Sequence, residues 1–356
     1  MRFHVTALPH TNTTTEFISC AYTAKVINFC RMMKDRGHTV FLYGGEKNEA
    51  PCDEHVIVAR ERERVAHLGN DHFTAASFDP SADLWRRANH RTALGIRRRA
   101  QPQDFICVIG GYAQKAIADA LPRMMTVEFG IGYGSTFAPY RVFESYAWMH
   151  TVYGAQTMGR PHDADGKFFD AVIPGYLDPA QFPFSENPGE YYLFVGRLID
   201  RKGYGIAADA TRGMGRRLIV AGQGNLPDDE RFAHCDHVGL VGPEERGRLM
   251  SGARAVFVPT IYVEPFANVH VEAMACGTPV ITTDWGVFTE TVDDGVTGYR
   301  CRTLSEFKEA AKSAHLLDRR VIRDRAVSRF SLDVVGEKYE RYFHRLSKLW
   351  GGGWYD

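Results

Sequence analysis

Two carboxylates eight residues apart, Glu264 and Glu272, are the side chains best placed to do chemistry in this sequence. Just after the first of them, Pro265 blocks earlier helix propagation and Asn268 can cap a helix. Residues 269–276 are apolar on nearly every side, which is typical of a buried helix. At about 1.5 Å of rise per residue, Glu272 lies roughly 6 Å beyond Asn268, so both acids can face one cleft at the helix N-terminus.

A carboxylate in an interior setting, such as Glu272, is costly unless something binds it. The helix N-terminus beside it offers unpaired N–H groups and a positive dipole end, which together suit a phosphate. Gly277 and Pro279 end the helix, and the β-branched run VITT predicts a strand after them. Two acids that can bind sugar hydroxyls beside a phosphate seat indicate a nucleotide-sugar site.

Two cations, Arg197 and Lys202, follow the predicted strand YYLFVG on a single loop. In open α/β sheets, ligands bind beyond the carboxyl ends of the strands. An arginine can bind a diphosphate as a fork and a lysine can bind it as a point charge. For an isolated pair with this spacing, a solvated basic loop is the more ordinary interpretation. The two carboxylates further along the chain favour a diphosphate site instead.

Together these motifs resemble the large retaining family of GT-B glycosyltransferases, whose mark is Glu, seven residues, Glu, and then a small-residue helix with GTPV. The segments FVGRLIDRKG, LIVAGQG, VGLVG and DDGVTGYRC stand in the order of that family. The resemblance is specific over roughly residues 190–349 and departs from the family at Ala267, where glycine is common. YRVFESYAWMH and GRLIDRKG together are similar to glycosyltransferases encoded by phages.

The resemblance implies a role for each donor-side residue. Arg197 and Lys202 would hold the donor diphosphate and stabilise the leaving nucleoside diphosphate. Glu264 would bind hydroxyls of the transferred sugar, and Glu272 would bind the ribose, unless it belongs to an internal hydrogen-bond network. The other implied donor-binding residues are Phe266, Ala267 and Asn268, through their backbone amides, and Gly196, Gly222, Gln223 and Gly242 on neighbouring loops.

In this family the donor phosphate itself is held to take the acceptor's proton, so the resemblance implies no catalytic nucleophile. The protein would supply position and charge. The implied cosubstrate is a UDP- or GDP-sugar, with no other cofactor and no metal.

The N-terminal half supplies candidates for the acceptor side. LPHTNTTTEF is a hydroxyl-rich turn. The resemblance implies that this turn faces the donor phosphates and the acceptor; the alternative is an ordinary helix-capping loop. Glu128 stands at a predicted strand end where relatives carry a histidine, and it could bind a sugar hydroxyl or assist proton transfer. His150 fits a buried core histidine as well as a catalytic one. The candidates in the turn are His10, Thr11, Asn12 and Thr13.

Six arginines gather in the predicted helical stretch 85–99. They form either a solvated basic helix face or a docking patch for a polyanionic acceptor, such as DNA, a lipid diphosphate or an acidic glycan. The acceptor therefore stays open between a modified DNA base and a polysaccharide or lipid-linked glycan. The arginines are Arg86, Arg87, Arg91, Arg97, Arg98 and Arg99.

Two other clusters contain metal-ligand residue types. Asp163, Ala164 and Asp165 spell the DxD of metal-dependent transferases, but they lie in a glycine-bearing turn beside a linker. Residues 234–237 read HCDH, yet adjacent residues cannot all point at one ion, so we expect a surface loop there.

The chain of 356 residues exceeds the size at which single cores stop growing, so we expect two domains. Alternating strands and helices predict an α/β fold with mostly parallel sheets. The resemblance specifies a GT-B fold, with two Rossmann-like domains facing a cleft. The predicted boundaries are 1–175 for the acceptor domain, 190–330 for the nucleotide-sugar donor domain and 331–356 for a helix that returns to the first domain, with a proline-rich linker at 174–189. In the first half, strands are predicted at 3–8, 39–45, 104–111, 124–130, 148–154 and 170–176, and a helix at 15–36.

Composition excludes several classes of protein. No apolar run approaches the 18 residues of a membrane span, and the N-terminus lacks the apolar core of a signal peptide. Seven scattered cysteines without a CxxC pair indicate free thiols in a reducing cytoplasm, that of the host if a phage encodes the chain. A formal net charge of zero favours neither nucleic acid nor membrane.

Two rival functions come from other classes. One is another nucleotide-sugar enzyme on the same fold, an epimerase or a phosphorylase; a phosphorylase would carry a lysine for pyridoxal phosphate, and no such motif is evident. The other is a non-catalytic protein that binds sugar or nucleic acid. Such a binder has little use for a diphosphate clamp made by Arg197 and Lys202.

Overall fold

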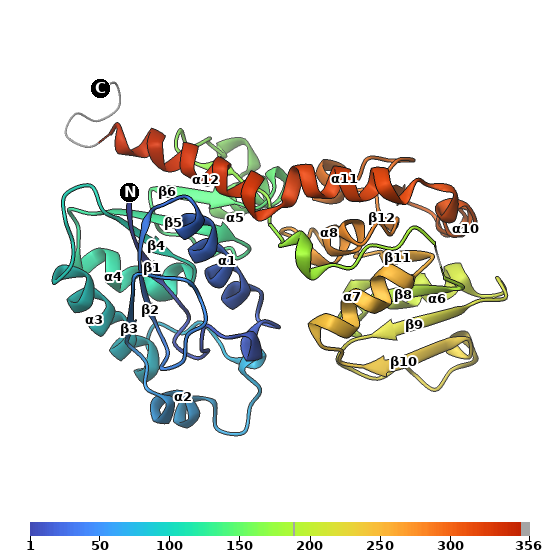
Figure 1. Cartoon of the computed structure of the whole chain (residues 1–356), viewed down its shortest axis with the longest axis horizontal. Helices are drawn as coiled ribbons and strands as arrows, with labels where there is room; N and C mark the ends of the chain where they lie inside the picture. Colours follow the sequence, from blue (N-terminus) through green and yellow to red (C-terminus); the bar gives the residue numbers. More distant parts are fainter. Residues whose placement is uncertain (188, 350–356) are drawn as a thin grey trace. The chain divides into compact units, whose positions relative to one another are not determined.

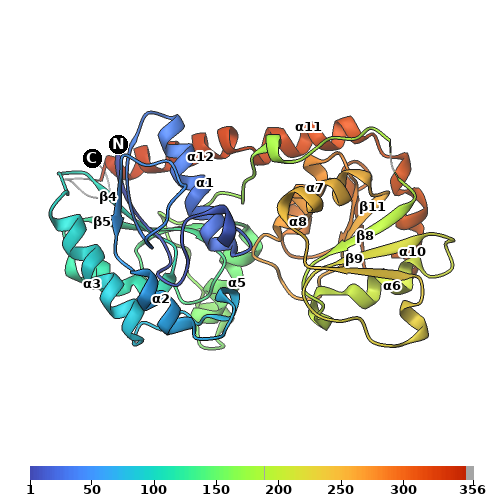
Figure 2. The same cartoon turned by 60° about the horizontal axis from the view of Figure 1, so that its bottom comes forward.

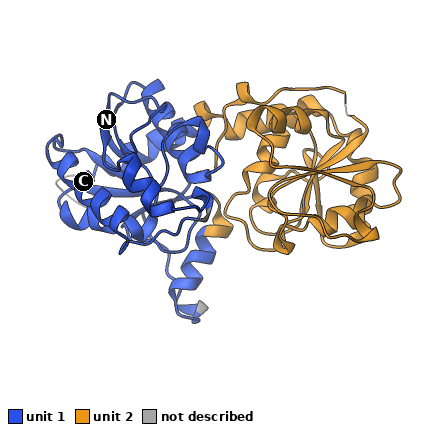
Figure 3. Cartoon of the chain, turned by 90° about the horizontal axis from the view of Figure 1, so that it is seen from below, with its two compact units in different colours: residues 1–144, 149–174, 335–356 blue, residues 145–148, 175–334 orange. Residues whose placement is uncertain are grey.

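The computed structural model describes residues 1–187 and 189–349, and it divides into two compact units (Figure 3). Unit 1 contains residues 1–144 and 149–174 and the chain from Val335 onward; unit 2 contains residues 145–148 and 175–334. The units therefore differ from the predicted domains at 145–148 and at 331–334, which group with unit 2. Pro188 of the predicted linker and residues 350–356 of the predicted C-terminal segment lie outside the described residues.

The described part of unit 1 is built on a seven-stranded parallel sheet with the order β3-β2-β1-β4-β5-β6-β7 (Figure 1). Its strands are β1 (Arg2–Thr6), β2 (Thr39–Gly44), β3 (Glu54–Ile57), β4 (Phe105–Val108), β5 (Met125–Ile131), β6 (Tyr140–Phe143) and β7 (Ala171–Val172). Strands β4 and β5 are buried along their whole length, because helices cover both faces of the sheet.

The helices of this part of the chain are α1 (Ala21–Asp35), α2 (Glu61–Leu68), α3 (Asp83–Arg97), α4 (Lys115–Ala120), α5 (Tyr146–Gln156) and α12 (Leu332–Ser347). Helices α3 and α4 pack on one sheet face. Aromatic contacts fix α1 and α12 on the other face. Phe3 stacks on Phe105 with ring centroids 5.9 Å apart, Phe343 of α12 approaches Phe3 at 4.7 Å, and Phe29 of α1 lies 4.4 Å from Phe129.

Unit 2 contains a six-stranded parallel sheet with the order β10-β9-β8-β11-β12-β13 among its described residues. Its strands are β8 (Tyr191–Val195), β9 (Arg217–Ala221), β10 (Cys235–Gly239), β11 (Ala255–Val258), β12 (Val280–Thr283) and β13 (Gly298–Cys301). Its helices are α6 (Tyr204–Thr211), α7 (Pro243–Gly252), α8 (Asn268–Ala275), α9 (Phe288–Thr291), α10 (Leu304–Ser313) and α11 (Arg319–Phe330). Helices α7, α8 and α11 pack on one face of the sheet and α6 and α10 on the other (Figure 2).

The predicted fold class is confirmed: each unit is an α/β domain with a parallel sheet. Three local predictions are wrong. Residues 148–154 lie in helix α5, not in a strand, because Ser145 and Glu290 cap its first turn. Cys235, Asp236 and His237 belong to the edge strand β10 instead of a loop, while His234 lies in the turn before it. Asn268 is the first residue of α8, not its cap, since Ala267 takes the cap position.

One further prediction of local structure is partly right. The predicted helix at 15–36 begins only at Ala21, after a short 3-10 turn at Thr15–Phe17. All seven cysteines are free thiols, as predicted. Within the described ranges, none of the helices has both the length and the apolar character that crossing a bilayer requires.

Candidate functional site

The candidate site lies at the carboxyl edge of the unit 2 sheet, where the loop after β8 meets the loop after β11. The first loop ends in a 3-10 turn, Asp200–Lys202, followed by Gly203 with a φ of +77°. A Cβ at this glycine would lie 2.1 Å from the carbonyl oxygen of Pro259, so any larger residue would clash with the backbone there. This close backbone contact brings Lys202 beside the second loop.

Lys202 and Glu264 form an ion pair at this edge. The Glu264 carboxylate also accepts a hydrogen bond from the Thr260 hydroxyl at 3.2 Å, and only 6% of its side chain is exposed. Burial alone would lower the pKa of Lys202, but the Glu264 charge and hydrogen bond, with Tyr262, raise it overall. The Lys202 ammonium therefore stays charged at neutral pH. It also lies 5.2 Å from the centre of the Tyr262 ring.

The start of α8 stands next to this pair. Ala267 has φ +63° and ψ +65°, a left-handed conformation that favours glycine, which explains why glycine is common at the matching position of the resembled family. Phe266 is buried and anchors the turn. Among the described residues, no acceptor receives a hydrogen bond from the backbone N–H of Phe266, Ala267 or Asn268. These amides are the donors that an anionic ligand would need.

The second carboxylate, Glu272, has a protein partner, Arg246 of α7. The Arg246 Nε atom lies 3.2 Å from Glu272 Oε2, and 13% of the Glu272 side chain is exposed. Burial raises the pKa of Glu272, and the positive charge of Arg246 offsets part of this rise. The structure thus adds Arg246 to the residues around the predicted ribose site, which no sequence motif indicated.

The remaining donor-side candidates lie on loops at the same edge. Gly222 has φ +156°, and a Cβ there would come within 1.8 Å of the Gly196 carbonyl oxygen, so these two predicted glycines are in backbone contact. Gln223 is exposed and accepts a hydrogen bond from the Leu198 N–H through its carbonyl. Gly242 starts α7. Of the two predicted cations, Arg197 is exposed and forms no ion pair with any described residue.

In unit 1, Glu128 lies within strand β5 and is fully buried, not at a strand end as predicted. Its Oε2 accepts hydrogen bonds from the N–H groups of Phe137 and Ala138, both at 3.0 Å, and its Oε1 accepts one from the Tyr133 hydroxyl at 3.3 Å. Burial raises the pKa of Glu128 to about 7, although these hydrogen bonds lower it. The carboxyl group therefore holds the loop that follows its own strand.

The predicted turn after β1 is buried and bonded to its surroundings. Thr11 Oγ1 lies 2.8 Å from Thr23 Oγ1, Thr13 donates to Asn48 Oδ1 at 2.6 Å, and Asn12 accepts from the Lys47 N–H at 3.2 Å. In the same turn, His10 is enclosed by the rings of Phe78 and Trp85, and burial lowers its pKa to about 4. His150, by contrast, is exposed on α5, so the expectation of a core histidine is wrong.

Most of the six arginines in α3 and in the two residues after it already bind groups of unit 1. Arg91 binds Glu63 at 2.7 Å and Arg99 pairs with Glu54. The partners of the others are Asp83 for Arg86 and Arg87 and the Ala120 carbonyl for Arg97; Arg98 is exposed. Carboxylates thus neutralise much of the charge that the polyanion hypothesis requires.

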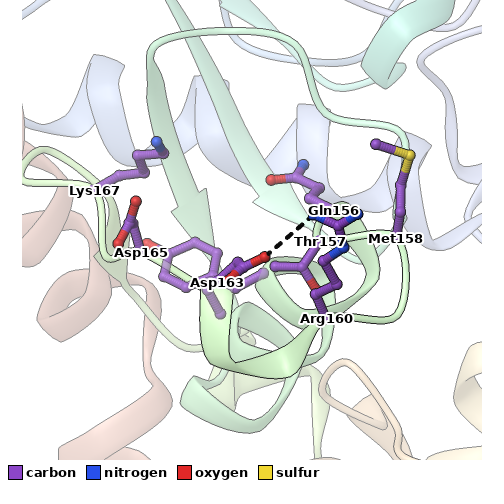
Figure 4. Close-up of a pocket in the computed structure, with 9 residues that line it drawn as sticks. Gln156, Thr157, Met158, Arg160, Asp163, Asp165 and Lys167 are labelled. Atoms are coloured by element: carbon purple, nitrogen blue, oxygen red, sulfur yellow. Dashed lines mark ion pairs between the residues drawn. The ribbon is translucent and has the colours of Figure 1, made fainter.

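Asp163 and Asp165 line a cavity of about 450 Å³ in unit 1, together with Arg160 and Lys167 (Figure 4). Arg160 Nη1 lies 4.0 Å from Asp163 Oδ2. Within the part of the chain that the structure describes, no group of three or more His, Cys, Asp or Glu side chains is arranged to hold a metal ion. The cavity thus mixes both signs of charge.

Residues 189–318, which contain this unit 2 edge, match the family model described as Glycosyl transferases group 1. The phosphatidyl-myo-inositol mannosyltransferase of Mycobacterium leprae is 29% identical over 180 residues, which cover 45% of this chain and 47% of the relative. The chain thus spans about half the length of the curated relatives it matches.

Two solved structures share the fold over nearly the whole chain. AviGT4, a glycosyltransferase involved in avilamycin A biosynthesis, is 21% identical with a TM-score of 0.66 and covers 98% of both chains. Anabaena HepE, solved in complex with UDP-glucose, is 18% identical with a TM-score of 0.63 over 98% of this chain and all of the other. The two parallel-sheet units therefore form a GT-B fold.

Proposed function

We propose that this chain is a retaining glycosyltransferase that moves a sugar from a nucleotide-sugar donor, without a metal ion, and that the carboxyl edge of unit 2 binds the donor. The observation that carries the proposal is the partly buried Lys202–Glu264 ion pair beside three backbone amides that have no acceptor among the described residues, inside the segment that matches group 1 glycosyltransferases. The likeness in fold to a UDP-glucose complex supports the same class of donor.

Each group has a task in this proposal. Lys202 carries three N–H donors, and Glu264 occupies one of them, so the ammonium can neutralise a diphosphate while it stays paired. The exposed guanidinium of Arg197 supplies a second cation on the same loop. The Glu264 carboxylate, held by Lys202 and Thr260, accepts hydroxyls of the transferred sugar.

Glu272 is proposed to bind the donor ribose together with Arg246, its partner in α7. The leaving nucleoside diphosphate gains stabilisation from Lys202 and from the amides of residues 266–268, and in a retaining reaction of this kind the donor phosphate takes the acceptor's proton. The chain then contributes position and charge, without a protein nucleophile.

The acceptor is proposed to be a modified DNA base, a polysaccharide or a lipid-linked glycan. The ion pairs of Arg91 in α3 and of Arg99 just after it weigh against binding of a polyanion along this whole stretch. Similarity to phage-encoded members, which rests on sequence motifs alone, is the reason to keep DNA among the acceptors that are tested.

The test is a transfer assay with UDP-, GDP- and ADP-sugars against a panel of glycans, lipid-linked sugars and modified DNA. The proposal predicts release of nucleoside diphosphate that depends on an acceptor, and a product with the anomeric configuration of the donor by NMR. Inversion would refute the retaining mechanism. Conversion of the donor sugar without any acceptor would instead identify an epimerase.

A further inference from the structure

Two carbonyl groups in the turn before α8 are held by side chains that no motif in the sequence singled out. Ser145 Oγ donates to the Pro265 carbonyl oxygen at 2.8 Å. The His270 Nδ1 atom lies 2.6 Å from the Ala267 carbonyl oxygen, which also accepts from the His270 backbone N–H at 3.1 Å. Both Ser145 and His270 are fully buried, and both belong to unit 2.

The hydrogen-bond partners fix the tautomer of His270. A carbonyl oxygen can only accept, so Nδ1 must carry the proton that is shared with Ala267. Burial lowers the pKa of His270 to about 4, which leaves the ring neutral at pH 7. The other nitrogen, Nε2, lies 2.7 Å from the Thr291 hydroxyl, which also lies within hydrogen-bond distance of the Val287 carbonyl oxygen, at 2.8 Å. The imidazole is thus locked between α9 and the start of α8.

Peptide planarity links these carbonyls to the amides of the candidate site. In a trans peptide unit the C=O and the following N–H point in opposite directions. A fixed carbonyl at Pro265 therefore fixes the direction of the Phe266 N–H, and a fixed carbonyl at Ala267 fixes that of the Asn268 N–H. Neither of these two N–H groups has an acceptor among the described residues.

We propose that Ser145 and His270 are positioning residues of the donor site, which hold the Pro265 and Ala267 carbonyls so that the Phe266 and Asn268 amides face the donor diphosphate. This inference rests on the proposed function. It adds a specific requirement: loss of either side chain weakens recognition of the diphosphate and leaves recognition of the nucleoside unchanged.

Ser145 also caps helix α5, since its Oγ accepts from the Trp148 N–H at 3.1 Å. A loss of stability in Ser145→Ala would therefore not distinguish a positioning role from a structural one. The ratio of two dissociation constants does distinguish them. A general loosening of the unit weakens binding of nucleoside and nucleotide alike, whereas misdirected amides affect the phosphates alone.

The experiment titrates the full chain with UDP and uridine, and with GDP and guanosine, by calorimetry. Ser145→Ala is expected to raise the Kd of the diphosphate by about fivefold or more, with the Kd of the nucleoside unchanged. Ser145→Thr, which keeps the hydroxyl, is expected to restore most of the affinity. Thr211→Val is the matched control, because it removes a fully buried hydroxyl from the end of α6, at the opposite edge of the sheet.

A second pair of variants covers the case in which Ser145→Ala does not fold. His270→Leu is expected to weaken diphosphate binding selectively, and His270→Asn, whose amide can replace the Nδ1 donor, is expected to retain it. Equal effects on nucleoside and diphosphate, or no effect on either, would overturn the inference. Failure of the unsubstituted chain to bind any nucleoside diphosphate would instead refute the proposed donor site, and this inference would fall with it.

Discussion

The buried carboxyl group of Glu128 should make the stability of unit 1 depend on pH. Its pKa is about 7 in the folded chain against an ordinary value of 4.5, so between these values the folded state binds more protons than the unfolded state. The contribution of Glu128 to the free energy of unfolding is therefore fully present below about pH 4.5 and is lost as the pH rises through about 7. At about 1.36 kcal/mol for each pKa unit, the loss amounts to about 3 kcal/mol.

Glu128→Gln tests this directly, because the amide oxygen can still accept from the N–H groups of Phe137 and Ala138 but cannot ionise. Urea unfolding is followed by fluorescence between pH 4.5 and 8. As the pH rises, the free energy of unfolding of the variant should increase relative to that of the native chain by up to about 3 kcal/mol. Glu16→Gln, at an exposed position, controls for the loss of one negative charge. If the free energies of unfolding of the native chain and of Glu128→Gln changed in parallel with pH, the pKa of Glu128 would not be raised in the folded chain.

Three further outcomes are expected. Gly203→Ala should lower the free energy of unfolding by about 2 kcal/mol more than Gly213→Ala does, because both glycines have φ near +78° but only the first Cβ would meet a carbonyl oxygen; equal effects in urea unfolding would contradict the backbone contact. Arg91→Ala should cost about 1 kcal/mol at pH 7 through loss of the Glu63 ion pair, and a change of Tm no larger than that of Arg98→Ala would argue against it. EDTA should leave the transfer rate unchanged, and restoration of an EDTA-inhibited rate by a divalent ion would remove the metal-free proposal.

The parts of the fold that depend on the local pattern of apolar and polar residues could be predicted from the sequence. The buried apolar runs FICV and YYLFV are strands because parallel sheets covered on both faces need continuous apolar residues. The prediction was wrong where contacts with residues distant in the sequence determine the secondary structure. WMHTVYG has the β-branched and aromatic residues of a strand, yet it is helical, because the Glu290 carboxylate binds the N–H groups of Tyr146 and Ala147, where the helix begins.

The same division applies to the candidate site. The spacing of Glu264 and the loop position of Lys202 predicted two side chains that the structure brings into contact. No motif could have paired Glu272 with Arg246, or Ser145 with Pro265, since these contacts join separate elements of the chain. The left-handed backbone conformation at Ala267 could not be predicted from the sequence either, because alanine rarely adopts it. Glu128 was predicted as a catalytic candidate from a position at a strand end where relatives carry a histidine, while its partners in the following loop decide its environment.

Binding of a nucleotide-sugar donor at the carboxyl edge of unit 2 should depend on Lys202. The most direct measurement is the Kd of UDP and GDP for the native chain and for Lys202→Ala, with Lys167→Ala as a control at an exposed lysine of unit 1. We expect one of these nucleotides to bind the native chain and the control equally, and to bind Lys202→Ala about 10–100-fold more weakly, because a charge-assisted hydrogen bond is lost. Unchanged affinity in Lys202→Ala, with its fold intact, would show that the donor does not bind through Lys202.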